Sequence, residues 1–251
     1  MVHIIGAGPG DPELITVKGQ RYLSEADVVI YAGSLVNPKL LDYCKDGAEI
    51  HNSASMTLDD VVAVIEQAES KGQMTVRLHT GDPSVYGAIQ EQMDAFGKKG
   101  IDFDVIPGVS SCFATAAALK QEYTLPGISQ TVIITRNEGR TPVPEREKLR
   151  SLAQHQSTMC IYLSITMLDQ VVAELIAGGY TKETPIAIVQ RASWPEQKIV
   201  RGTLATIVED IKGKNIDRTA MIVVSNCLNA DYELSRLYAP EFSHMFRKAS
   251  K

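Results

Sequence analysis

Residues 76–87 read VRLHTGDPSVYG and place a strand directly before a helix, across one tight loop. Val76 and Leu78 alternate with polar residues, a pattern typical of a strand. Asp82 is predicted to cap the following helix, and Pro83 takes its first position, where a missing N–H costs nothing. Such a loop exposes backbone N–H and C=O groups at the carboxyl edge of a sheet, where open α/β proteins bind small ligands.

The N-terminus repeats this arrangement. Residues 2–5 (VHII) form a predicted strand, residues 6–12 (GAGPGDP) form a loop, and a helical pattern begins at Glu13. Gly-Asp-Pro therefore occurs twice, at 10–12 and at 81–83, each time between a strand and a helix. Each aspartate is interpreted as a helix cap worth about 1 kcal/mol, a role that does not exclude contact with a ligand.

The glycines of the first loop do not form a dinucleotide fingerprint. In a G-x-G-x-x-G motif that starts at Gly6, the third glycine would fall on Asp11, whose carboxylate would face the pyrophosphate. The chain also lacks a G-x-x-x-x-G-K-[ST] motif. A carboxylate at both predicted helix starts disfavours NAD and ATP and leaves room for a sulfonium or an amine.

Composition is that of an ordinary soluble protein. The chain has 251 residues, 44% hydrophobic and 22% charged, enough for one large domain or two modest ones. Its net charge of -5 gives no basic field for nucleic acid, and its apolar runs are too short for a membrane span. The first strand begins at Val2, which leaves no room for a signal peptide, so we expect a cytoplasmic protein. Reduced, buried thiols and no metal site are expected from four scattered cysteines, Cys44, Cys112, Cys160 and Cys227.

The order of predicted elements indicates two α/β lobes. Residues 1–120 alternate five strands with helices, which predicts a mostly parallel sheet. A hinge is expected at 121–129 (QEYTLPGIS), followed by a second α/β domain at 130–228 with a more mixed sheet. The tail, 229–251, has no strong periodicity. The predicted helices are 14–23, 38–47, 58–68, 83–99, 111–119, 145–154 and 167–177, and the predicted strands are 2–5, 26–31, 48–50, 74–78, 103–106, 131–134, 159–163, 186–189, 199–200 and 221–224.

Two lobes joined by a short hinge predict a cleft, and clefts between domains are favoured ligand sites. The loops expected to line it are 6–12, 79–86, 107–111, 136–144, 163–166 and 190–197. Basic side chains gather on these loops, and arginine can bind a carboxylate through two parallel hydrogen bonds. These basic residues favour an acidic substrate, although the alternative is that they only form solvated ion pairs at the surface. The candidates for substrate binding are Arg136, Arg140, Arg191 and Lys198.

Several longer motifs resemble the tetrapyrrole (corrin and porphyrin) methyltransferase family, in order and at the expected spacing from residue 2 to about 228. They are GAGPGDPELIT at 6–16, VRLHTGDPSVYGAI at 76–89, PGVSS at 107–111 and TVIITRNEGRTPVPE at 131–145. The first three identify only the family. The fourth, with ASWPEQKIVRGTL at 192–204, is more diagnostic of the branch that methylates C11 of precorrin-4 in cobalamin biosynthesis.

The resemblance implies a homodimer of two-domain α/β chains that binds S-adenosylmethionine between its lobes and releases S-adenosylhomocysteine. Together with the element order it predicts a tetrapyrrole-methylase-like α/β fold with a cofactor cleft between the lobes. By motif position it assigns cofactor contacts to Pro9, Thr80, Gly81, Asp82, Val85, Ser110, Ser111, Leu163, Ala192, Thr219 and Ala220. Proline and glycine in this set could instead only shape turns, and the leucine could be a core residue.

The implied reaction moves a methyl group to C11 of precorrin-4 or cobalt-precorrin-4, and any cobalt would arrive with the substrate. The main expected contribution of the protein is to position the methyl donor and the ring carbon relative to each other. His79, Tyr86 and Asp11 are candidates for a general base, and no catalytic residue is assigned. The alternatives are methylation of another carbon, as in uroporphyrinogen III at C2 and C7 or in another precorrin, and a non-catalytic module that binds S-adenosylmethionine.

Overall fold

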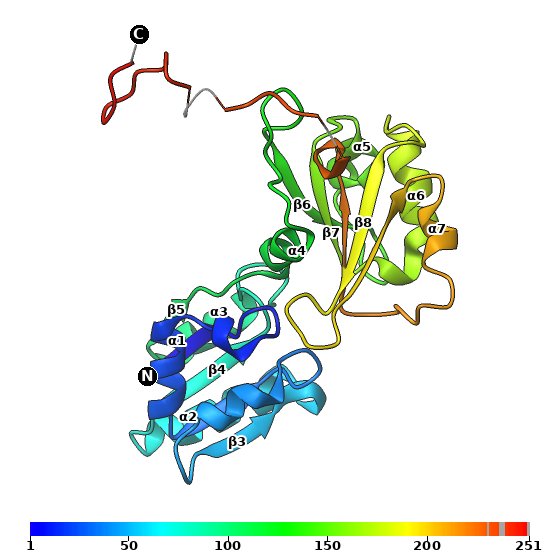
Figure 1. Cartoon of the computed structure of the whole chain (residues 1–251). Coiled ribbons are helices and arrows are strands. Elements are labelled where there is room, and N and C mark those ends of the chain that lie inside the picture. The colour runs from blue at the N-terminus through cyan, green and yellow to red at the C-terminus, as the bar shows by residue number, and fades with distance from the viewer. Residues whose placement is uncertain (230, 236–238, 250–251) are drawn as a thin grey trace. The chain divides into compact units, whose positions relative to one another are not determined.

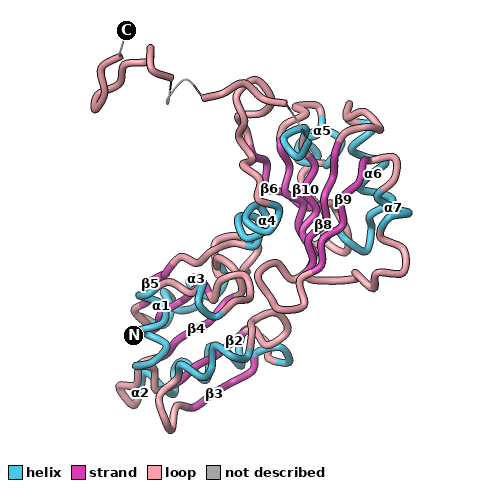
Figure 2. The backbone as a smooth tube through the Cα atoms, in the orientation of Figure 1, coloured by secondary structure: helices cyan, strands magenta, loops and turns pink. Residues whose placement is uncertain are grey.

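The structure is a computed structural model that describes residues 1–229, 231–235 and 239–249. It divides into two compact units, the first made of Met1–Ala118 with Arg191–Lys198 and the second of Leu119–Gln190 with Ile199–Lys251. Each unit contains one five-stranded sheet (Figures 1 and 2). The expected α/β class is confirmed. Part of the unassigned tail, residues 230, 236–238 and 250–251, lies outside the described residues.

The sheet of the first unit is parallel throughout and has the strand order β3-β2-β4-β1-β5. Its strands are β1 (Val2–Gly6), β2 (Val28–Tyr31), β3 (Glu49–Asn52), β4 (Thr75–His79) and β5 (Phe103–Ile106). β1 and β4 pair from Val2 opposite Thr75 to Gly6 opposite His79. The loops that follow these two strands, which contain the two Gly-Asp-Pro triplets, therefore begin side by side at the carboxyl edge.

Helices cover both faces of this sheet. Ile4 and Ile30 pack with Phe96 in one core cluster, and Ile5 and Leu78 belong to a second cluster on the opposite face. The helices are α1 (Val17–Glu25), α2 (Leu58–Ser70), α3 (Gln90–Lys99) and α4 (Ser111–Leu119), whose last residue falls in the second unit. The α2 cap follows the sequence prediction, because Thr57 and Asp60 form a reciprocal capping box.

Two helices begin later than the sequence predicts. The helix expected from Pro83 onward begins at Gln90, because Tyr86 and Ala88 adopt positive φ angles of 56° and 50° that no α-helix contains. The helix expected from about Leu14 is first a 3-10 turn, Pro12–Leu14, and α1 then begins at Val17. Asp11 and Asp82 are therefore not caps of long helices, although each carboxylate accepts a backbone N–H two residues later.

The second unit has a mixed sheet with the strand order β6-β7-β10-β8-β9. Its strands are β6 (Val132–Arg136), β7 (Thr158–Tyr162), β8 (Pro185–Gln190), β9 (Lys198–Thr203) and β10 (Ala220–Val224). β6 and β7 are parallel, whereas β10 is antiparallel to both β7 and β8. The mixed sheet expected from the sequence is confirmed.

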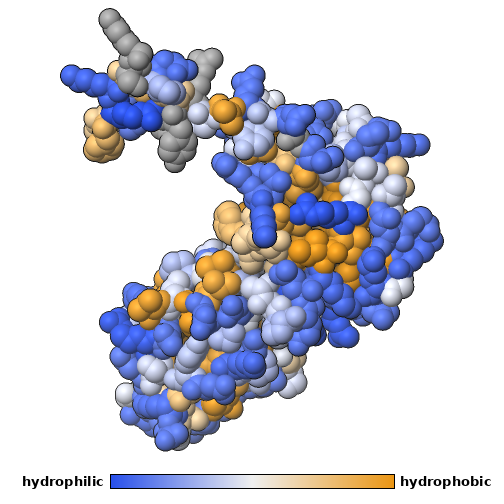
Figure 3. Space-filling view, in the orientation of Figure 1, coloured by the Kyte–Doolittle hydropathy of each residue, from blue (hydrophilic) through white to orange (hydrophobic). Residues whose placement is uncertain are grey.

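Three helices pack on one face of this second sheet (Figure 2): α5 (Leu149–Ala153), α6 (Leu168–Ala177) and α7 (Ile207–Asp210). The helix expected over 145–154 is interrupted, since Glu145–Glu147 is a 3-10 turn and Lys148 leaves helical geometry before α5. Hydrophobic residues also gather over the strands of this unit in the space-filling view (Figure 3).

Within the described residues, no helix is long and apolar enough to cross a membrane. Cys112, Cys160 and Cys227 are buried as expected, but Cys44 is partly exposed.

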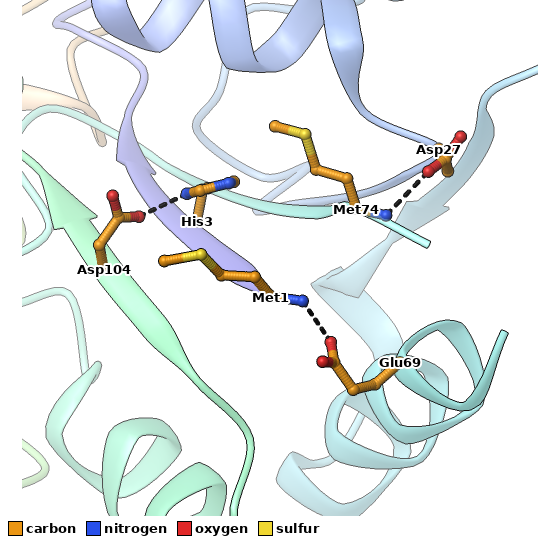
Figure 4. Close-up of polar contacts among 6 residues, drawn as sticks. All are labelled: Met1, His3, Asp27, Glu69, Met74 and Asp104. Carbon is orange, nitrogen blue, oxygen red and sulfur yellow. Dashed lines mark hydrogen bonds and ion pairs between the residues drawn. The ribbon is translucent and has the colours of Figure 1, made fainter. Parts of the chain in front are cut away.

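Polar contacts join the strand ends of the first sheet at its amino edge (Figure 4). The N-terminal amine of Met1 contacts Glu69, and His3 Nδ1 lies 2.5 Å from Asp104 Oδ1. Asp27 accepts hydrogen bonds from the Met74 N–H at 2.8 Å and from Lys45 Nζ at 2.6 Å. The bond from Lys45, and then the Met74 N–H, hold the pKa of Asp27 below its usual value.

Asp27→Asn is expected to remove a pH-dependent contribution to stability. The folded-state pKa of Asp27 lies below its usual value of 3.8, so the contribution is present above that pH and disappears as the pH falls through the folded-state value. The midpoint of thermal unfolding should be higher for wild type than for the variant near neutral pH, and this gap should close below about pH 4. Asp46→Asn, at an exposed position of the same unit, is the control. A gap that is constant between neutral pH and about pH 3 would contradict the expectation.

Candidate functional site

The loops after β1 and β4 are hydrogen-bonded to each other through their backbones. Gly8 N–H donates to Gly81 O at 3.2 Å, and Gly81 N–H donates to Gly8 O at 2.8 Å. Both residues have positive φ angles, 76° and 61°, which glycine adopts without steric cost. The two Gly-Asp-Pro loops therefore form one paired structure at the carboxyl edge of the sheet.

A third loop, after β5, packs against this pair by backbone contact. A Cβ added to Gly108 would lie 2.2 Å from Gly81 O and 2.8 Å from Gly6 Cα. The Asp82 carboxylate joins the same loops, since it accepts the Gly108 N–H at 2.9 Å and the Ser84 N–H at 2.8 Å. Both of its oxygens are thus used to hold the loops together.

The 191–198 segment, Arg191–Lys198, binds the first Gly-Asp-Pro loop. Trp194 Nε1 donates to Pro9 O at 3.0 Å, and Ser193 Oγ accepts the Asp11 N–H at 3.0 Å. The indole lies so close to Gly10 that a Cβ there would be 1.9 Å from Nε1. Sequence reasoning missed this contact, because the partners are more than 180 residues apart and only the lone tryptophan hinted at it.

A cavity of about 390 Å³ lies within the first unit beside the second Gly-Asp-Pro loop. Thr80, Val85 and Tyr86 of that loop line it, together with the strand residues Arg77 and His79. Burial, and then the positive charge of Arg77, lower the pKa of His79 to about 3, so its ring is neutral at physiological pH. A ring with so low a pKa is a weak general base.

The chain matches the family of Tetrapyrrole (Corrin/Porphyrin) Methylases over residues 1–208. The chain belongs to this family.

A named relative and two solved structures show which members of the family this tetrapyrrole methylase resembles. It is 60% identical to "Cobalt-precorrin-4 C(11)-methyltransferase" of Methanocaldococcus jannaschii, covering 100% of this chain and 97% of the relative. An X-ray structure of cobalt precorrin-4 methyltransferase, a cobalamin biosynthetic enzyme, has a TM-score of 0.89 at 47% identity, covering 91% of this chain and 96% of that one. A uroporphyrin-III C-methyltransferase from Thermus thermophilus, complexed with S-adenosyl homocysteine, has a TM-score of 0.74 at 27% identity, covering 91% and 93% of the two chains.

The predicted cofactor contacts of this methylase fall in both units. In the first unit, those on the three loops and the 191–198 segment are Pro9, Thr80, Gly81, Asp82, Val85, Ser110, Ser111 and Ala192. In the second unit, antiparallel pairing brings the end of β7, next to Leu163, beside the start of β10 at Thr219 and Ala220. Leu163 is 64% exposed and has a φ of +54°, a strained conformation for an apolar residue. It is not a core residue.

The four predicted substrate-binding residues are divided between the units. Arg136 and Arg140 lie in the second unit, and Arg136 donates to backbone carbonyls of its own loop, at Thr141 and Pro142 among others. Arg191 lies in the first unit, and Lys198 is both the last residue of the 191–198 segment and the first residue of β9. The Arg191 guanidinium stacks 5.5 Å from the Trp194 ring centre and lies 3.7 Å from Glu196.

The three loops of the first unit suit a sulfonium ligand. Residues 6–12, 79–86 and 107–111 contain two aspartates and no lysine or arginine. They offer backbone groups, the hydroxyls of threonine and serine, and short apolar side chains, which match an uncharged adenosine and a positively charged sulfur better than a phosphate. The residues present therefore fit S-adenosylmethionine.

Proposed function

We propose that this tetrapyrrole methylase transfers a methyl group from S-adenosylmethionine to C11 of precorrin-4 or cobalt-precorrin-4 in cobalamin biosynthesis. The observation that carries the proposal is its 60% identity, over its whole length, to an enzyme named for that reaction. Methylation of uroporphyrinogen III is less well supported, since the relative named for it in Cyanidium caldarium is 31% identical. The same similarity to named enzymes disfavours a non-catalytic binding module.

The main contribution of the chain's own residues is to position the methyl donor and the tetrapyrrole. When bound, S-adenosylmethionine supplies an electrophilic methyl group on a positively charged sulfur. The paired loops and the 191–198 segment fix the loops that carry Pro9, Gly81 and Ala192, which would hold it. Fixing two reactants in line can lower a barrier by about 7–11 kcal/mol. We assign the cofactor contacts to the residues named above and no residue to proton removal.

Turnover on three tetrapyrroles tests the proposed substrate. The enzyme is incubated anaerobically with S-adenosylmethionine and, separately, cobalt-precorrin-4, metal-free precorrin-4 and uroporphyrinogen III, and mass spectrometry counts the methyl groups gained. One methyl on a precorrin-4 form and none on uroporphyrinogen III is the expected result. Methylation of uroporphyrinogen III instead, or no turnover at all despite cofactor binding, would contradict the proposal.

Arg140→Ala is expected to weaken tetrapyrrole binding, because we assign Arg140 to a substrate carboxylate. Its side chain is exposed in the 137–144 loop, so its loss should not disturb folding. Loss of one charge-assisted hydrogen bond of about 1.5–3 kcal/mol predicts a KM raised about 10-fold or more, with cofactor affinity unchanged. Arg150→Ala, which removes an exposed ion pair with Glu174, is the matched control. An unchanged KM in Arg140→Ala would remove Arg140 from the substrate site.

We also propose that the enzyme acts as a cytoplasmic homodimer, as its resemblance to the family implies. Light scattering after gel filtration measures the mass directly. A mass of twice 27.4 kDa is expected, and a monomer at assay concentrations would contradict this proposal.

A further inference from the structure

The central strand β4 carries a row of polar side chains that is buried. Thr75, Arg77 and His79 alternate with Val76 and Leu78 and are 1%, 6% and 5% exposed. In the sequence this alternation is typical of a strand with one solvated face, but both faces of β4 are covered by helices. An arginine and a histidine inside a protein unit need an explanation, because burying a charge is costly unless the charge is paired.

Arg77 is held in place but is not paired with an anion. Its Nε donates to Gln92 Oε1 at 3.0 Å, and its Nη1 donates to Ile30 O at 3.2 Å. Among the described residues, no carboxylate lies within ion-pair distance of it, and its Nη2 has no hydrogen-bond partner. Burial lowers the pKa of Arg77 to about 10, so the guanidinium is still charged at neutral pH.

The unpaired charge lines the 390 Å³ cavity of the first unit. His79 lines it too, and its Nε2 atom is buried without a hydrogen-bond partner among the described residues. Glu91, the only carboxylate among the lining residues, is exposed and forms no ion pair with Arg77. A buried guanidinium and an imidazole whose Nε2 has no partner in the described part of the chain lie on one wall of the cavity, and both can donate a hydrogen bond to a carboxylate.

We propose that this cavity is a carboxylate site, filled during the reaction by one acetate or propionate side chain of the tetrapyrrole and completed by Arg77 and His79. The inference rests on the proposed function, which supplies the polycarboxylate substrate. Gln92 and the Ile30 carbonyl position the guanidinium. The methionine part of the methyl donor also carries a carboxylate, so the experiment must separate the two sources.

The first experiment separates them by kinetics and calorimetry. Arg77→Gln and His79→Gln are compared with wild type for the KM of cobalt-precorrin-4, for kcat and for the Kd of S-adenosylhomocysteine. Thr75→Val is the matched control, because Thr75 is buried on the same face of β4 and does not line the cavity. Loss of a buried charge-assisted bond predicts a KM for cobalt-precorrin-4 raised about 10–100-fold in Arg77→Gln and raised less in His79→Gln. The Kd of S-adenosylhomocysteine should stay within about twofold of the wild-type value.

The second experiment needs no turnover and remains informative if Arg77→Gln fails to fold. Proton–carbon NMR of wild-type enzyme follows the His79 ring, identified by the signal that His79→Gln lacks, while cobalt-precorrin-4 or S-adenosylhomocysteine is added alone. A bound carboxylate offsets the Arg77 charge, so the pKa of His79 should rise and its ring signal should shift. The shift is expected with the tetrapyrrole and not with S-adenosylhomocysteine.

Two results would overturn the assignment. One is an unchanged KM in His79→Gln together with an unshifted His79 signal in wild type. The other is a weakened Kd for S-adenosylhomocysteine with an unchanged tetrapyrrole KM, which would give the cavity to the methyl donor. Failure of the proposed function is recognised separately, because wild-type enzyme would then methylate neither form of precorrin-4.

Discussion

Gly108→Ala is expected to lower the thermal unfolding midpoint of the enzyme by about 6–12 °C. The added Cβ would lie 2.2 Å from Gly81 O and 2.8 Å from Gly6 Cα, and both are backbone atoms that no rotamer change can move. Overpacking of this kind costs about 3 kcal/mol, and each kcal/mol shifts the midpoint of a protein of this size by about 2–4 °C. The loops of the candidate cofactor site would have to separate, so affinity for S-adenosylhomocysteine should fall as well.

Gly97→Ala is the matched control for this prediction. Gly97 lies inside α3, and a Cβ there would meet no atom within 4 Å. Replacing a glycine by alanine within a helix should stabilise it by about 0.5–1 kcal/mol. A Gly108→Ala variant as stable as Gly97→Ala would show that the three loops are not in close backbone contact.

Trp194→Ala is expected to weaken S-adenosylhomocysteine binding by about 10-fold or more. The indole packs on Gly10 and donates to Pro9 O, and it holds the segment that carries Ala192. Its removal takes away both the packing and the hydrogen bond, so two proposed cofactor contacts lose their support. Calorimetry measures the affinity, and the unfolding midpoint shows whether the first unit loosens at the same time.

Two further variants separate the causes of this effect. Trp194→Phe keeps a ring but removes the N–H donor, and one net hydrogen bond of about 0.5–1.5 kcal/mol predicts a 2–13-fold loss of affinity. Glu196→Gln, in the same segment, removes only an exposed contact with Arg191 and should change little. If Trp194→Ala bound S-adenosylhomocysteine as wild type does, the 191–198 segment would have no part in the cofactor site.

Local patterns in the sequence predicted much of the fold. Alternation of apolar residues gave the parallel strands of the first unit, and Thr57 with Asp60 gave the start of α2, because both signals lie within a few residues. The two Gly-Asp-Pro loops were predicted to lie at the carboxyl edge of the sheet and are paired there.

Long-range contacts could not be predicted in the same way. The start of α3 is set by positive φ angles at Tyr86 and Ala88, residues with no intrinsic preference for them. Trp194 and Pro9 are in contact although 185 positions separate them in the sequence. The burial of Arg77 and His79 depends on helices that cover both faces of β4, whereas a polar–apolar alternation by itself predicts a solvated face.

The position of the transferred methyl group decides whether this enzyme methylates C11. The enzyme is incubated anaerobically with cobalt-precorrin-4 and S-adenosylmethionine whose methyl carbon is carbon-13, and the product is examined by carbon NMR. We expect a single enriched methyl carbon, bonded to C11 of the macrocycle. Enrichment at any other ring carbon would leave the family and the fold intact and contradict the proposed reaction.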